Sequence, residues 1–139
     1  MPMAREVLAL RGKTLDDAHP MVAFSMLLLG RALGPLGQLE EGERWIREAY
    51  ALRQRAVPPD HWILASTRSI LGGHLVLAKR YREAEPIMLA AERELTAALG
   101  PDAPIVALAR ERLVRLYTAW NRPAEAQAWR QKLPAAPAP

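Results

Sequence analysis

Three histidines and two pairs of glutamates are the side chains of this sequence whose types and spacing could support chemistry. The histidines are His19, His61 and His74. A protein metal site needs several clustered ligands, each oriented by a neighbouring polar group. His19 and His61 lie 42 positions apart, each directly before a predicted helix, which favours a turn or helix-capping role. His74 alone makes no metal site, so the sequence predicts no metal and no cofactor.

The glutamate pairs Glu41-x-Glu43 and Glu83-x-Glu85 have a spacing that paired carboxylates of an acid–base site could also have. Both pairs begin a predicted helix, where the helix dipole favours acidic side chains, and we interpret them as structural. No Ser–His–Asp order and no nucleophile-elbow motif occurs. The absence of cysteine excludes disulfides, zinc ribbons and thiol catalysis. We therefore expect no enzymatic activity.

The net charge of +4 is carried by arginine, because Lys13, Lys79 and Lys132 are the only lysines. A basic chain raises the question of nucleic-acid binding. Here the arginines are spread among glutamates in every segment, and no aromatic platform lies beside a basic cluster. The longest apolar run, residues 21–30, is about half of a membrane span, and no signal peptide is visible. We expect no nucleic-acid binding, no membrane insertion and a cytoplasmic location.

The chain repeats itself with a period of 42 residues and no insertion. Adding 42 to His19-Pro20 gives His61-Trp62 and then Ala103-Pro104. The same shift relates further sets of similar residues: Leu29-Gly30 and Leu71-Gly72; Glu41, Glu83 and Glu125; Trp45, Ile87 and Trp129. So many matches in one frame indicate a repeat protein.

Each unit has the pattern of two amphipathic helices joined by turn residues. The first helices are predicted over residues 20–33, 62–78 and 104–119, and the second over 40–56, 82–98 and 123–132. The expected fold is all-α, a right-handed superhelical stack of helix-turn-helix repeats with about seven helices.

Small residues are expected where the two helices of a unit cross. Gly30 and Gly72 fall inside first helices, where each costs about 1 kcal/mol relative to alanine. That cost is explained if a second helix packs against the bare backbone, with Gly42 and Ala84 as the facing residues. Larger apolar side chains should fill the remaining space, namely Leu29, Leu33, Ile46, Leu71, Leu75 and Met88.

The unit resembles the 42-residue tetratricopeptide repeats of the kinesin-light-chain type. The resemblance lies in Leu71-Gly72, in Tyr-Arg-Glu-Ala-Glu-Pro at 81–86 and in Leu-Gly-Pro-Asp at 99–102. It covers nearly the whole chain up to Leu133. We expect a single domain over residues 1–133, with repeats at 20–59, 62–101 and 104–133 and a flexible Pro/Ala tail at 134–139.

A narrower resemblance concerns residues 61–65, 112–117 and 119–123, which are similar to the C-terminal repeats of certain bacterial serine/threonine protein kinases. The catalytic motifs of a kinase domain are absent from this sequence. The resemblance implies a non-catalytic arm of a signalling kinase or a free-standing relative. Val114 replaces the small residue of the repeat and Arg130 an apolar one, and both changes suit a terminal capping repeat.

Residues 4–18 are expected to form a half repeat, because Val7 aligns with Ala49 of a second helix and the sequence has no matching first helix before it. Residues 5–15 would then lack part of their cover. Three explanations stay open: a truncated gene product, a C-terminal fragment of a larger protein, or self-association through residues 5–15.

The resemblance implies a ligand groove lined by the first helices. The side chains expected to face it are Phe24, Leu27 and Arg31, then Ser66, Ser69, Gly73 and His74, then Leu108, Glu111, Arg112 and Arg115. An arginine pair such as Arg31 with Arg115 would suit an acidic or C-terminal carboxylate ligand. Leu28 and Ile70 replace the asparagine of chaperone-tail-binding repeats, so we do not predict that ligand.

The leading hypothesis is a non-catalytic protein–protein interaction module, an adaptor or sensory arm that binds a peptide or protein in this groove. The alternative is a structural or oligomerisation module that joins other repeats, or a second copy, through its N-terminal half repeat.

Overall fold

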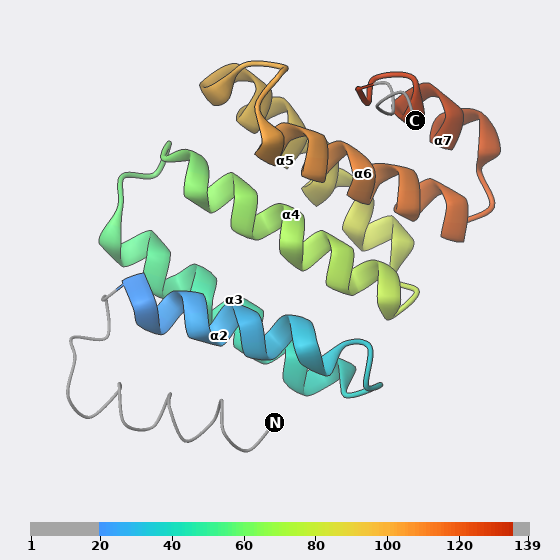
Figure 1. Ribbon diagram of the computed structural model, residues 1–139. Helices are drawn as coiled ribbons and strands as arrows, with labels where there is room; N and C mark the ends of the chain where they lie inside the picture. The colour runs from blue at the N-terminus through green and yellow to red at the C-terminus, as the bar shows by residue number, and fades with distance from the viewer. Residues whose placement is uncertain (1–19, 135–139) are drawn as a thin grey trace, which may run out of the picture.

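Six helices and no strands make up residues 20–134, the part of the chain that the computed structural model describes (Figure 1). In chain order they are α2 (Pro20–Leu33), α3 (Leu39–Ala56), α4 (Trp62–Leu77), α5 (Tyr81–Leu99), α6 (Pro104–Ala119) and α7 (Pro123–Arg130). The all-α prediction is confirmed, and these helices begin and end within about two residues of the predicted bounds. The half repeat at 4–18, the surface at 5–15 and the tail beyond Pro134 lie outside the described residues.

The helices pair as hairpins, α2 with α3, α4 with α5 and α6 with α7. Successive hairpins stack through contacts of α3 with α4 and of α5 with α6, and α4 also packs along α6. In Figure 1 the first helices α2, α4 and α6 form one layer, and α3 and α5 lie behind them. The three first helices therefore share one face of the stack.

The turn inside each hairpin has the same backbone conformation in all three repeats. Its central residue has a left-handed φ of 82° at Gly37, 63° at Lys79 and 58° at Asn121. Glycine and asparagine adopt this conformation readily, whereas lysine does so at a cost. The following amide then donates to a carbonyl at the end of the first helix, as Arg80 N does to Leu75 O at 2.9 Å. The shared turn gives the three hairpins the same geometry.

The first hairpin closes by direct approach of two helix backbones. A Cβ atom added to Gly30 would lie 2.8 Å from the carbonyl oxygen of Gly42 and 2.7 Å from Cγ1 of Ile46. One added to Gly42 would lie 2.9 Å from the carbonyl oxygen of Gly30. In the second hairpin a Cβ on Gly72 would collide with Met88. The helix crossing predicted from these small residues is confirmed.

The core lies between the two layers and runs through all three repeats. The predicted packing residues Leu29, Leu33, Ile46, Leu71, Leu75 and Met88 are all buried. One apolar cluster joins Val22 of the first repeat to Leu75 and Met88 of the second and Leu116 of the third. A single hairpin cannot bury its apolar face alone, so the stacking of neighbours provides the core.

The last hairpin differs from the other two. Val114 replaces the glycine of the first two repeats and is half-buried, and α7 has only 8 residues. Ala126 is buried against α6 and keeps the small contact residue. Arg130 is exposed, so the last described helix turns a charged side chain to solvent.

Candidate functional site

Repeat-equivalent positions of α2, α4 and α6 form one surface. Residues four and seven positions apart share a helix face, and the repeat places equivalent residues at the same level in each helix. The four levels are Phe24, Ser66 and Leu108; Leu28, Ile70 and Arg112; Arg31, Gly73 and Arg115; and Pro35, Leu77 and Ala119. We call this surface the first-helix groove.

A pocket of about 490 Å³ opens in the last three levels of the groove. Its walls are mainly aliphatic, and three arginines of α2 and α6 also line it. The lining residues are Arg31, Pro35, Ile46, Ile70, Gly73, His74, Val76, Leu77, Arg112, Arg115 and Ala119. A largely apolar concavity with a few convergent polar groups is the usual form of a ligand site.

Arg112 is positioned in the groove by α4. Its Nη1 donates a hydrogen bond to Oγ of Ser69 at 3.0 Å. The stem of Arg112 passes over Gly73, where an added Cβ would lie 3.5 Å from its Cδ, an ordinary contact. Burial, together with the positive charges of Arg31 and Arg115, lowers the pKa of Arg112 to about 10. Arg112 therefore stays charged at pH 7, although burial and the neighbouring arginines disfavour its positive charge. A bound anion would stabilise that charge.

Four of the described arginines outside the groove, Arg47, Arg68, Arg80 and Arg110, have carboxylate partners. Nη1 of Arg68 lies 2.5 Å from Oε2 of Glu94, and Nε of Arg110 lies 3.0 Å from Oε2 of Glu92. Within residues 20–134, by contrast, no carboxylate lies at ion-pair distance from the three groove arginines, Arg31, Arg112 and Arg115. The three groove arginines therefore lack a carboxylate partner in the described part of the chain, and Arg112 is held by Ser69 instead.

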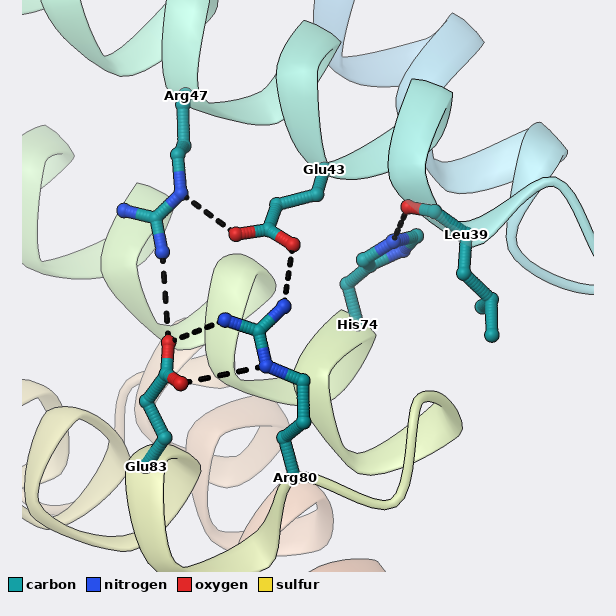
Figure 2. Close-up of polar contacts among 6 residues, drawn as sticks. All are labelled: Leu39, Glu43, Arg47, His74, Arg80 and Glu83. Carbon is teal, nitrogen blue, oxygen red and sulfur yellow. Dashed lines mark hydrogen bonds and ion pairs between the residues drawn. The ribbon is translucent and has the colours of Figure 1, made fainter.

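Glu43 and Glu83 belong to an ion network that joins the first two repeats (Figure 2). Nη1 of Arg80 lies 2.5 Å from Oε1 of Glu43, and its Nη2 lies 2.7 Å from Oε2 of Glu83. Nε of Arg47 lies 2.8 Å from Oε2 of Glu43. Burial alone would raise the pKa of Glu43, but hydrogen bonds from Arg47 and Arg80 lower it below its usual value. These carboxylates act as ion-pair partners, which agrees with the structural interpretation of the glutamate pairs.

His74 joins α4 to the beginning of α3. Its Nε2 lies 2.7 Å from the carbonyl oxygen of Leu39 (Figure 2). A carbonyl only accepts, so Nε2 carries the proton and donates. The ring also fills the space beside two glycines, since a Cβ on Gly42 would lie 2.6 Å from Cε1 of His74 and one on Gly34 3.2 Å from Nδ1. The side chain is buried and forms part of the pocket floor.

Replacing His74 with leucine should lower the free energy of unfolding by about 1–2 kcal/mol, because the hydrogen bond between repeats is lost and the ring contacts change shape. Thermal unfolding followed by circular dichroism measures the loss. His74→Gln is the matched variant, since its amide can still donate to Leu39, and it should unfold at a higher temperature than His74→Leu. Equal unfolding temperatures for the two variants would contradict this role of the hydrogen bond.

The structure brings most of the predicted groove residues to one surface. Phe24, Arg31, Leu108, Glu111 and Arg115 are exposed, and Ser66, Gly73 and Arg112 are half-buried. Ser69 and His74 are buried beneath the groove, and each contributes a polar contact there.

Leu27 does not belong to the groove. It is 4% exposed and packs in the core. Leu28, the next residue, is 49% exposed and takes the groove position. One step along a helix turns a side chain by about 100°, so a shift of one position moves a residue from the groove to the interface with α3.

Residues of the pocket wall were not predicted, among them Ile70, Val76, Leu77 and Ala119. The repeat frame contained a signal for two of them. Adding 42 to Pro35, which follows α2, gives Leu77 and then Ala119. Repeat equivalence therefore extends the groove to the last residues of α4 and α6 and to the turn after α2.

The two described histidines have structural contacts. Nδ1 of His61 accepts a hydrogen bond from the amide of Ile63 at 3.1 Å, so the predicted helix cap at His61 is confirmed. His19, its repeat equivalent, lies outside the described residues. Across residues 20–134 no group of three or more potential metal ligands comes together. In the same part of the chain, every helix is too short or too polar to cross a membrane.

Comparison with known proteins agrees with the repeat architecture. A sequence profile of the tetratricopeptide repeat matches residues 22–63. No curated protein sequence matches significantly. The crystal structure of a variant of the nearly identical TPR-like repeats of a "putative kinesin light chain" from Podosopora anserina is similar, with a TM-score of 0.75 and 21% identity. The match covers 94% of this chain and 62% of that chain. A second crystal structure of these repeats gives a TM-score of 0.72 with the same identity and coverage.

At this identity the likeness shows the fold, and the predicted tetratricopeptide-like helical stack is confirmed. The chain spans 62% of the length of the solved structures that it matches. Tetratricopeptide repeats generally mediate contacts between proteins, and their fold is typically non-catalytic.

Proposed function

We propose that this chain is a non-catalytic protein-interaction module that binds a peptide or protein segment in the first-helix groove. The observation that supports it most is the pocket of about 490 Å³, where three arginines without carboxylate partners among the described residues meet an aliphatic wall. Such a surface favours an amphipathic ligand over a purely polar or purely apolar one.

The first two levels of the groove support the same proposal. Phe24, Leu28 and Leu108 are 48%, 49% and 47% exposed. Single exposed apolar residues are common on protein surfaces, but here three lie on one face beside a pocket. A ligand that covered them would remove apolar surface from water and contribute to binding.

The experiment is an affinity capture in which Arg31, Arg112 and Arg115 are all replaced with glutamine. We expect the variant to lose the proteins that the unchanged chain retains, because its charge-assisted hydrogen bonds to the ligand are gone. Captured proteins are identified by mass spectrometry and then tested one by one with purified components. If the variant retained every partner, the first-helix groove would not be the binding site.

The matched control replaces three arginines of the second helices, Arg44, Arg82 and Arg93, which are exposed. This variant changes the net charge by the same amount but leaves the groove intact. It should capture the same partners as the unchanged chain. If both triple variants lose the partners, the effect comes from net charge and not from the groove.

Two finer proposals concern the biological setting. The similarity of residues 61–65 and 112–117 to kinase-associated repeats supports a role as an arm of a bacterial signalling kinase, and an in-frame kinase domain encoded upstream of Met1 would support it.

Self-association through residues 5–15 is tested by sedimentation of the isolated chain. A monomer at high concentration would argue against it.

A further inference from the structure

We propose that the arginine side of the first-helix groove binds the phosphate group of a phosphorylated serine or threonine, and that the apolar side holds a large apolar residue of the same peptide. This inference rests on the proposed function and names the chemistry of the ligand. It follows from the charge at the pocket, from the way Arg112 is held, and from the order of residues along α2 and α6.

Charge distinguishes a phosphate from a carboxylate at this site. Arg31, Arg112 and Arg115 contribute three positive charges, and Glu111 is the acidic residue that acts on Arg112. The pocket lining itself has three arginines and no acidic residue, so a phosphoryl group of about −1.5 to −2 at pH 7 balances more of its charge than a carboxylate does. A single carboxylate carries half of that charge and offers two oxygens to three guanidiniums. A phosphoryl group offers three.

The groove arginines are positioned for convergent contacts. One N–H of Arg112 is occupied by Ser69, which fixes the guanidinium over α4. Gly73 presents no side chain, so the space between α2 and α6 at the level of Arg31 and Arg115 is open. Planar guanidinium groups bind phosphate oxygens in pairs, and they do so more strongly when desolvated. Arginines of α2 and α6 therefore line the same pocket from opposite sides.

The order of residues along the helices gives the ligand a second anchor. Along α2 the exposed face passes from Phe24 to Arg31, and along α6 from Leu108 to Arg115. Seven residues of helix rise by about 10 Å. An extended peptide advances by about 3.3 Å per residue. A peptide lying along the groove would therefore place its apolar residue about three positions from the phosphorylated one.

A peptide fits this surface better than a free anion or a nucleic acid. Inorganic phosphate would leave Phe24, Leu28 and Leu108 exposed. A nucleic acid presents successive phosphates and needs a basic track. The described arginines outside the groove lie in ion pairs, on the second helices or, at Arg122, over the ring of Trp120. The exposed apolar residues and the single charged pocket together favour one phosphorylated side chain on a peptide.

The test uses the full chain and three bead-bound peptide libraries with phosphoserine, glutamate or serine at a fixed central position and all other positions randomised. We expect retention on the phosphoserine library, with enrichment of leucine, isoleucine, methionine or phenylalanine about three positions from the centre. The best peptide is then labelled with fluorescein and measured by anisotropy. Its affinity should exceed that of the glutamate form by about tenfold or more.

Single variants separate the two halves of the site. Arg112→Gln should weaken the phosphopeptide by about 10- to 100-fold, since hydrogen bonds to charged groups are lost. Leu108→Ser should weaken the phosphoserine and glutamate forms by the same factor and abolish the apolar preference. The triple variant of Arg44, Arg82 and Arg93 should bind as the unchanged chain does. Unfolding temperatures near that of the unchanged chain show that each variant is folded.

The outcomes are distinguishable from failure of the proposed function. Equal affinity for glutamate and phosphoserine peptides, or inorganic phosphate that competes as strongly as the phosphopeptide itself, overturns the phosphate inference. If partners from the affinity capture are lost by the groove variant but still bind after phosphatase treatment, the interaction module stands and the phosphate inference falls. If the groove variant retains every partner and binds the phosphopeptides as tightly as the unchanged chain does, the proposed function and the phosphate inference are both wrong.

Discussion

Replacing Gly30 with leucine is expected to lower the free energy of unfolding by about 1–3 kcal/mol. The reason is the backbone contact between α2 and α3, where an added Cβ would lie 2.8 Å from the carbonyl oxygen of Gly42. That oxygen belongs to helix backbone and cannot turn away as a side chain would. The helices must separate, and the contacts of Ile46 around the crossing are lost with them.

The matched control is Gly73→Leu, the same change in a first helix at a position that faces the groove. Its Cβ would meet Arg112 Cδ at 3.5 Å, an ordinary contact, so leucine should gain up to about 1 kcal/mol from its better helix propensity. Urea unfolding of both variants measures the difference. Equal stability of Gly30→Leu and Gly73→Leu would mean that the crossing of α2 and α3 is looser than the structure shows.

The helices could be predicted from the sequence because each repeat requires the same few residues. Gly30 and Gly72 recur at one place in the frame since a neighbouring helix lies against them, and Pro104 begins its helix for local reasons. Lys79 shows the limit of such local signals. Its residue type does not indicate a left-handed turn, and only its equivalence to Gly37 and Asn121 does.

The groove could be predicted less completely, because the angular position of a residue on a helix decides whether it is core or surface. Leu27 and Leu28 are the same residue type, yet one is buried and the other half exposed. The repeat frame brings Arg31 and Arg115 to one level, and that much followed from the sequence.

The arginines that lack a carboxylate partner could not be predicted from the sequence, because ion pairs join residues that are distant in the chain. Arg68 pairs with Glu94 of the next helix, and Arg112 reaches back to Ser69. Arginine occurs in all six described helices and glutamate in α3, α5, α6 and α7, so composition does not show which pairs form. The distances depend on how far each hairpin is rotated relative to the one before it, which is a property of the whole stack.

Replacing Glu92 with methionine is expected to cost about 3 kcal/mol of the free energy of unfolding, the lower end of the range for breaking a buried ion pair. Nε of Arg110 lies 3.0 Å from Oε2 of Glu92, and the two side chains are only 13% and 11% exposed. Thr96 also donates to Glu92, at 3.0 Å. Methionine fills a similar volume, so the loss reports the unpaired charge of Arg110 and not a cavity.

The double variant Glu92→Met with Arg110→Met should recover most of this loss, because an apolar pair of similar volume removes the uncompensated charge. The pair joins α5 to α6, so amide hydrogen exchange should quicken first in α6 and α7 of the Glu92→Met chain, where the third hairpin is held by this interface. Glu94→Met is the control, since Glu94 is 50% exposed and its pair with Arg68 should contribute less than about 1 kcal/mol. If the double variant were no more stable than Glu92→Met alone, the destabilisation would come from lost packing around α5 and not from an unpaired charge. The third hairpin would then be held mainly by apolar contacts such as those of Leu95 and Val106.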